Sequence, residues 1–328
     1  MSAYPSLSVI IPTYNRSASL SRLLDCLDQQ TYPVKGWEVI VVEDGSTDSG
    51  YSSVYERNYR FSIIHLQQNH QGAVLARNAG AQCSHAEILV FLDDDVIVAP
   101  GYLEGLAREH CMNDRALVMG LFQPSLGDQA GPFKKAVLRS GVTQDYQDQK
   151  NKIDFIHCVS HNISMKRRHF LEIGMFQDPT HQKGWPNWDD IDLAYRADRQ
   201  GFIFIQAFEA RGSHMDHVLD DFTAHCDRIY RAGVNANWLF CKYPELKEIL
   251  PMFKDKTPIH LGKDPFALIL RKILRLVLAW KPFLLLMEII THELEKKDPD
   301  SPFLLPLYRW INSSYIFRGY RFGLKTIE

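Results

Sequence analysis

The sequence has little that would mark a secreted, disulfide-bonded or zinc-dependent protein. Its six cysteines are scattered and form no C-x-x-C pair, which argues against a disulfide scaffold and against a cysteine zinc cluster. Residues 1–8 lack the charged-then-apolar pattern of a signal peptide. These features predict a reducing, cytoplasmic compartment.

The chain also lacks a strong net charge. The formal net charge is -2, so no global basic field points to a nucleic-acid partner. No G-x-G-x-x-G follows the first apolar run, which disfavours a dinucleotide site. With 328 residues, of which 45% are hydrophobic and 23% charged, the composition is that of a globular protein with one large or two modest domains.

Strand and helix patterns alternate along the first half of the chain. Short apolar runs predict strands, and apolar residues at helical spacing between them predict helices. The alternation indicates a parallel sheet with helices on both faces, in which ligands bind beyond the carboxyl ends of the strands. The expected strands are 7–11, 37–42, 61–66, 87–92, 159–165 and 202–208, and the expected helices are 20–27, 48–60, 71–83, 100–111 and 166–173.

Three carboxylates, Asp93, Asp94 and Asp95, end one of these strands. Strand alternation places Asp93 and Asp95 on one side and Asp94 on the other. Adjacent carboxylates repel one another unless they are neutralised, and a hard divalent cation carrying a phosphate would do so. Taken alone, the stretch is equally compatible with a solvated acidic turn.

Two more polar clusters, 13–16 and 43–44, fall at the ends of expected strands. A nucleotide fits the rim that they would form with the aspartates. Asp44 could accept hydrogen bonds from a base imide, and Arg77 could pair with phosphate or stack near the base. Each also has an ordinary role, because Asp44 begins a good turn and Arg77 could be a charge on a helix surface.

Together these stretches resemble the motifs of family 2 glycosyltransferases in order and spacing. The resemblance covers roughly residues 5–220. It implies an α/β GT-A (Rossmann-like) fold with a mixed, mainly parallel sheet, a nucleotide-sugar donor that is preferably a UDP-sugar, and Mg²⁺ or Mn²⁺ at a DXD motif. The matching segments are 9–16, 41–48, 76–80 and 91–95.

Two positions depart from the family pattern. Glu43 stands where the family usually has Asp, and Val96 follows the aspartates where another Asp is common, which leaves Asp95 as the metal ligand. His214, after the strand 202–208, matches a family histidine near the metal, although a surface histidine explains it equally well. The implied donor-binding set is Pro12, Thr13, Tyr14, Arg16, Glu43, Asp44, Arg77, Asp93 and Asp94.

A second chemical cluster lies at residues 184–193, where a helix is expected to begin at Asp189 or Asp190. An acidic N-cap explains an isolated Asp pair. Here the stretch also resembles the family's Glu-Asp-x-Asp-Leu motif, which implies that Asp190 is the catalytic base of an inverting transfer. Asp189 would assist acceptor orientation, and Trp185 and Trp188 could stack on sugar faces or simply pack.

The C-terminal third is expected to be helical. Residues 266–290 are strongly apolar but interrupted by Arg271, Lys272 and Arg275, which share one helical face. A basic amphipathic helix at a membrane surface fits this pattern, and so does a helix packed on the catalytic domain or in a homo-oligomer. A peripheral position at the inner face of the cytoplasmic membrane follows from the first reading.

The expected organisation is a catalytic domain, 1–220, and a helical region, 221–328. Within the domain, 1–122 would bind the donor and 123–220 the acceptor. The predicted function is inverting, metal-assisted hexosyl transfer to a glycan or lipid-linked acceptor, as in polysaccharide biosynthesis. A non-catalytic nucleotide or sugar binder of the same fold is the alternative, and a glycoside hydrolase, which also uses paired carboxylates, is a further one.

Overall fold

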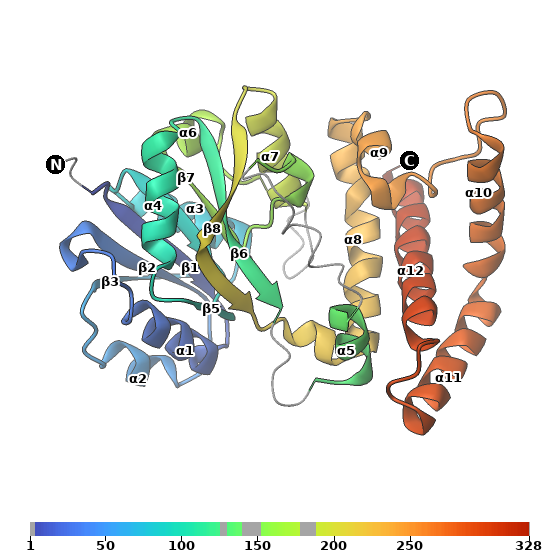
Figure 1. Cartoon of the computed structure of the whole chain (residues 1–328), viewed down its shortest axis with the longest axis horizontal. Coiled ribbons are helices and arrows are strands. Elements are labelled where there is room, and N and C mark those ends of the chain that lie inside the picture. The colour runs from blue at the N-terminus through green and yellow to red at the C-terminus, as the bar shows by residue number, and fades with distance from the viewer. Residues whose placement is uncertain (1–3, 125–129, 140–151, 178–187, 328) are drawn as a thin grey trace. The chain divides into compact units, whose positions relative to one another are not determined.

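The computed structural model describes residues 4–124, 130–139, 152–177 and 188–327 (Figure 1). The chain divides into two compact units. The first comprises Met1–Ser125, Gln147–Gly184 and Asp189–Met215, and the second comprises Leu126–Tyr146, Trp185–Trp188 and Asp216–Glu328.

Strands of the first unit form one eight-stranded sheet in the order β3-β2-β1-β4-β7-β6-β8-β5. The run β3-β2-β1-β4 is parallel, β7 is antiparallel to both of its neighbours, β8 is parallel to β6, and β5 is antiparallel to β8. The expected mixed α/β sheet is thus confirmed. The strands are β1 Leu7–Thr13, β2 Trp37–Asp44, β3 Ser62–Gln68, β4 Ile88–Leu92, β5 Val96–Val98, β6 Ala116–Pro124, β7 Asn162–Lys166 and β8 Ile203–His214.

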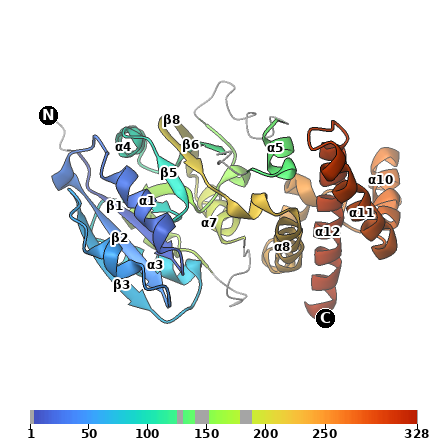
Figure 2. The same ribbon diagram turned by 90° about the horizontal axis from the view of Figure 1, so that it is seen from below.

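Helices cover both faces of this sheet (Figures 1 and 2). Val9 and Val41 pack in one core with the leucines of α1 and α4. Ile10, which points to the opposite face, meets α3 so closely that a Cβ on Gly80 would lie 2.5 Å from its Cγ2. The helices of this unit are α1 Ser17–Leu27, α2 Tyr51–Tyr55, α3 Ala73–Cys83, α4 Tyr102–Met112, α6 Arg167–Glu172 and α7 Asp189–Asp198.

One predicted element needs correction, and two observed elements were not predicted. The helix expected over 48–60 is only α2, because Gly50 precedes it and the chain turns again before β3. The short strand β5 follows the aspartates directly and was not expected. The helix α5 (Pro132–Arg139) was likewise not among the expected helices.

The second unit is helical, as expected for the C-terminal region. Helix α12 (Leu304–Ile327) packs between α8 (Phe222–Lys242) and α11 (Lys281–Lys297) (Figures 1 and 2). Glycines allow the close contact between α8 and α12: a Cβ on Gly319 would lie 2.0 Å from the carbonyl oxygen of Tyr230. Shorter helices are α9 Leu246–Ile249 and α10 Phe266–Leu278.

The apolar stretch 266–290 is two helices rather than one. Helix α10 ends at Leu278, Trp280 has an extended conformation, and α11 begins at Lys281 with Pro282 in its first turn. Proline fits the first turn of a helix but not its interior, so it sets this break. Within the described residues, no helix combines the length and the apolar character needed to cross a bilayer.

Candidate functional site

A pocket of about 270 Å³ opens at the carboxyl ends of the parallel strands. Most of the expected donor-binding residues line it, although they come from distant parts of the sequence. Glu43 and Arg77 are the members of that set that do not. The lining residues are Pro12, Thr13, Tyr14, Arg16, Asp44, His70, Gly72, Ala73, Asp93 and Asp94.

Asp44, at the end of β2, organises the loop that follows β3. One carboxylate oxygen accepts hydrogen bonds from the backbone N–H of Gln71 (2.8 Å) and the side chain of Gln68 (2.7 Å). The other accepts from the backbone N–H of Gly72 (2.8 Å) and lies 2.8 Å from Nδ1 of His70. Asp44 is 3% exposed, and both of its carboxylate oxygens already have partners.

His70 is a pocket residue that the sequence did not single out. Its ring stacks on Tyr14, with centroids 4.1 Å apart and planes 20° from parallel. Both rings line the pocket and Tyr14 is 43% exposed, so the pair presents a flat aromatic edge to the pocket. No motif in the sequence marks His70, because its contact with Asp44 forms only in the folded loop after β3.

Asp94 is held by residues of the first strand and its loop. Oγ1 of Thr13 donates to its carboxylate at 2.8 Å, and Nη1 of Arg16 lies 3.2 Å from it. Burial raises the pKa of Asp94 to about 6, against the opposing effects of Arg16 and Thr13. Arg16 therefore joins β1 to the acidic stretch.

Asp95 pairs with His214, which lies 119 residues further along the chain. Oδ1 of Asp95 is 3.0 Å from Nε2 of His214, and Oδ2 is 3.0 Å from Arg16. Burial alone would raise the pKa of Asp95, but the hydrogen bond and charge of His214, with Arg16, hold it down to about 2. His161, unassigned from the sequence, stacks on His214 at 4.2 Å, and burial lowers its pKa to about 4.

The side chains around Asp95 could act as ligands for a divalent cation that also binds substrate. Within the described residues, no group of three histidine, cysteine or acidic side chains forms a complete metal cage. Asp95 and His214 nevertheless bring an ionised carboxylate and an imidazole nitrogen together. Mg²⁺ commonly takes only one or two protein carboxylates and completes its shell with phosphate oxygens and water. Asp95 fits that pattern, and His214 is the neighbouring residue that could add a nitrogen ligand for a transition metal.

Arg77, at the centre of α3, is buried at 5% exposure. Its Nη2 donates to Asp93 at 2.6 Å, and its Nη1 lies 3.6 Å from Asp189. It thus connects the acidic stretch after β4 to the start of α7. Glu43 likewise points away from the pocket and lies 3.0 Å from Nε2 of His65.

Asp190 lies in the first turn of α7 and is partly buried. One of its oxygens accepts a hydrogen bond from the backbone N–H of Ile191 at 2.8 Å. Burial and the charge of neighbouring Asp189 raise the pKa of Asp190 well above the usual range of an aspartate. Such a group can take up a proton near neutral pH.

The turn 173–176 holds α7 in place. Arg196 of α7 pairs with Asp192 at 2.7 Å and donates to the carbonyl oxygens of Ile173 and Met175. The side chain of Asn78, next to Arg77 on α3, donates to the carbonyl oxygen of Phe176 at 2.9 Å and accepts from the backbone N–H of Phe176 at 3.1 Å. Asp190 and Arg77 are therefore positioned by the same short turn.

Residues 8–174 match the family described as Glycosyl transferase family 2. The chain belongs to glycosyltransferase family 2. Validoxylamine A glucosyltransferase of Streptomyces hygroscopicus subsp. jinggangensis is 30% identical over 274 residues, which are 74% of this chain and 62% of that protein. Glycosyltransferase AglE of Haloferax volcanii is 36% identical over 105 residues, 31% of this chain and 34% of its own. The chain thus spans about 60% of the length of the first of these curated relatives.

Solved structures of other proteins share the fold. Mannosyltransferase PcManGT from Pyrobaculum calidifontis, in complex with GDP-Man and Mn²⁺, superimposes with a TM-score of 0.64 at 19% identity, covering 100% of this chain and 89% of its own. S. aureus TarS 1-349 in complex with UDP gives 0.52 at 16% identity, covering 98% and 91%. These likenesses confirm the GT-A fold of this family 2 glycosyltransferase.

Of the expected acceptor residues, Trp188 and Asp189 lie within the described part of the glycosyltransferase. Trp185 lies outside the described residues. Trp188 belongs to the second unit, where its indole N–H donates to the carbonyl oxygen of Ala232 at 2.8 Å and its ring meets the edge of Phe253. An acceptor role for either tryptophan stays a prediction.

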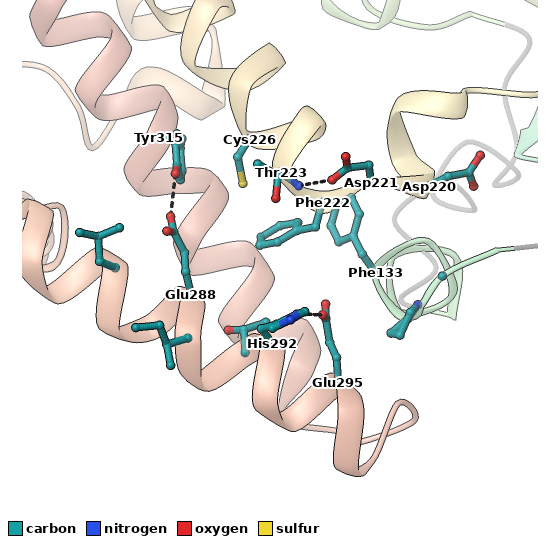
Figure 3. Close-up of a pocket in the computed structure, with 15 residues that line it drawn as sticks. Phe133, Asp220, Asp221, Phe222, Thr223, Cys226, Glu288, His292, Glu295 and Tyr315 are labelled. Atoms are coloured by element: carbon teal, nitrogen blue, oxygen red, sulfur yellow. Dashed lines mark hydrogen bonds and ion pairs between the residues drawn. The ribbon is translucent and has the colours of Figure 1, made fainter.

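The second unit of the glycosyltransferase contains a larger pocket, of about 560 Å³, between α5, α8, α11 and α12 (Figure 3). Its carboxylates already have partners: Glu288 accepts from Tyr315 at 2.7 Å, and Asp221 caps α8 through the N–H of Thr223 at 2.8 Å. Phe133 and Phe222 form an aromatic wall.

Proposed function

We propose that this family 2 glycosyltransferase moves a sugar from a nucleotide-sugar donor, preferably a UDP-sugar, to a hydroxyl of a glycan or lipid-linked acceptor. The transfer inverts the anomeric carbon and is assisted by Mg²⁺ or Mn²⁺. The observation that supports this most is the pocket at the strand ends, where a flat aromatic edge lies beside clustered carboxylates. A nucleoside needs an apolar wall, and a diphosphate with its cation needs carboxylates.

Donor binding is assigned to the strand-end pocket. The Tyr14–His70 edge would support the base, and Asp44 would contact the base imide after exchanging one of its present hydrogen bonds. Asp93 would hold the ribose hydroxyls. Arg77 acts as a positioning residue in this proposal, because it is buried against Asp93 and does not line the pocket.

A metal would be held by Asp95 and His214. Bound there, it would neutralise the charge of the departing nucleotide diphosphate. The carboxylate of Asp95 is prepared for this role, since its contacts with His214 and Arg16 keep it ionised well below neutral pH. Arg16 touches both Asp94 and Asp95, so it fixes the carboxylates relative to the pocket.

Asp190 is the proposed general base. Its carboxylate takes the proton from the acceptor hydroxyl while the acceptor oxygen bonds to the anomeric carbon. The bond from that carbon to the phosphate oxygen breaks on the opposite side, which inverts the configuration. The raised pKa of Asp190 suits this transfer, because a base is most effective when its pKa lies near the working pH.

The other function classes make different predictions. Membership of the glycosyltransferase family argues against a glycoside hydrolase. A non-catalytic binder would keep the pocket but would not need a base with a raised pKa at the start of α7. Release of nucleoside diphosphate from a panel of nucleotide sugars, with and without metal, separates these possibilities. A catalyst releases diphosphate in the presence of metal, whereas a binder shows saturable binding without release.

A further inference from the structure

An apolar surface on α10 and the first half of α11 is left uncovered within its own unit. Phe266, Leu270, Ile273, Val277 and Trp280 recur every three or four residues, so they form one stripe along α10. Soluble proteins rarely expose a contiguous apolar patch of this kind without a binding role. The exposed members are Phe266, Leu270, Ile273, Leu274, Leu276, Val277, Trp280, Leu285, Leu286, Ile289 and Ile290, with exposed fractions between 41% and 80%.

We infer that this surface, the α10–α11 face, inserts into the interface of a membrane that contains anionic phospholipid. The inference does not depend on the proposed transfer reaction, because it rests on surface composition alone. Such a face would lie in the plane of the interface, as amphipathic helices do.

The charges of α10 separate into an inward and an outward set. Lys272 is 4% exposed, and its ammonium contacts Asp264 at 2.7 Å and the carbonyl oxygen of Pro258 at 2.8 Å. Arg275 pairs with Asp255 at 2.5 Å. The cluster of Arg271, Lys272 and Arg275 expected at the membrane is therefore not available as a whole. Two of its members pair with half-buried carboxylates instead.

Arg271 and Lys281 remain exposed beside the apolar stripe. The sequence contains no acidic residue from 266 to 287, and the first one, Glu288, is hydrogen-bonded to Tyr315. The face thus combines apolar side chains with cations that no acid on the same stretch offsets. This composition complements an anionic lipid surface.

A second copy of the chain complements the face less well. In a two-fold symmetric dimer the same patch meets itself. The cations of one copy would then face a patch of the other copy that offers no acidic residue between 266 and 287 to pair with them. Trp280, 65% exposed at the junction of the two helices, is also the residue type that favours the membrane interface.

Vesicle co-sedimentation of the full chain tests the inference. Binding to vesicles of phosphatidylglycerol and phosphatidylcholine should exceed binding to phosphatidylcholine alone and should weaken as salt is added. The double variant Arg271→Gln/Lys281→Gln should bind roughly 25-fold more weakly, since each cation near an anionic surface contributes about a fivefold effect. Lys296→Gln/Lys297→Gln, at the polar end of α11, is the matched control and should bind as the parent does.

Insertion of the apolar stripe has its own test. Leu270→Ser/Ile273→Ser should abolish binding, and Met112→Ser, an exposed apolar residue of α4, should not. Vesicles should also shift the tryptophan emission to shorter wavelength, and Trp280→Phe should remove that shift. Thermal melting of each variant confirms folding. Absence of binding by the parent at low salt would overturn the inference, as would a concentration-dependent dimer that Leu270→Ser/Ile273→Ser dissociates.

Discussion

The guanidinium of Arg77 lies 2.6 Å from the carboxylate of Asp93 and 3.6 Å from that of Asp189. One buried cation thus connects the end of β4, proposed to hold the donor, with the start of α7, proposed to carry the base. The charge of Arg77 also acts on Asp190, because it opposes the rise in the pKa of that carboxyl group. The two halves of the site are electrostatically coupled.

Removing the Arg77 charge should therefore destabilise the fold and disturb the base. Arg77→Met leaves Asp93 and Asp189 without their shared cation, and breaking a buried pair in this way costs about 3–5 kcal/mol. Arg77→Lys, which retains the charge, should recover part of the free energy of unfolding. Denaturant unfolding measures both variants. Arg57→Met, which breaks an exposed pair with Asp25, is the control, and an equal loss in both Met variants would contradict the coupling.

Asp44→Ala should weaken UDP binding roughly 10–100-fold, the range expected when a charge-assisted hydrogen bond is lost. The change also removes the acceptor that fixes Gln71, Gly72 and His70, so the wall of the pocket loosens. Calorimetry measures the affinity. Asp25→Ala, an exposed carboxylate elsewhere on the unit, should bind UDP normally. Equal affinities for the two variants would remove Asp44 from the donor site.

Metal removal should abolish transfer, and Asp95→Ala should abolish the metal dependence of donor binding. Losing even a residue that supports a metal ligand typically costs about 10–100-fold in metal affinity, and a direct ligand should cost at least that much. His214→Ala should follow the same trend, while both variants remain folded. Titration of Mn²⁺ in the presence of UDP provides the affinities. Full turnover after chelation and removal of bound metal would rule out the metal role.

The strand-end residues could be predicted because they are local motifs attached to strands of recognisable pattern. Asp93, Asp94 and Asp95 follow an apolar run, and parallel strands bring such ends together. The partners that complete the site could not be predicted in this way. His161 and His70 meet their neighbours through sheet order and loop path, which no residue spacing encodes. Likewise, helical spacing grouped the cations of α10, but the positions of Asp255 and Asp264 decide which of them face inward.

The pH dependence of transfer should show an acidic limb well above the usual aspartate pKa of about 3.9. Burial, and then the charge of Asp189, raise the pKa of Asp190, and the base works only when deprotonated. Activity should therefore fall as the pH drops through this raised pKa. Asp189→Asn removes the second cause, so the limb of kcat/KM should move to lower pH. If the acidic limb of kcat/KM stays at the same pH in this variant, the limb reports the titration of another group.

Asp190→Asn should lower the transfer rate by about 10²–10⁴-fold, because the amide keeps the shape of the side chain but accepts no proton. Donor affinity should persist, since the strand-end pocket does not include this residue. Asp198→Asn, an exposed position near the end of the same helix, provides the control for changes in α7 and should transfer normally. The measurements are the transfer rate and donor affinity of each variant and the anomeric configuration of the parent's product. A single displacement assisted by one base inverts that configuration. Near-normal transfer by Asp190→Asn, or retention in the product, would exclude Asp190 as the base of an inverting reaction.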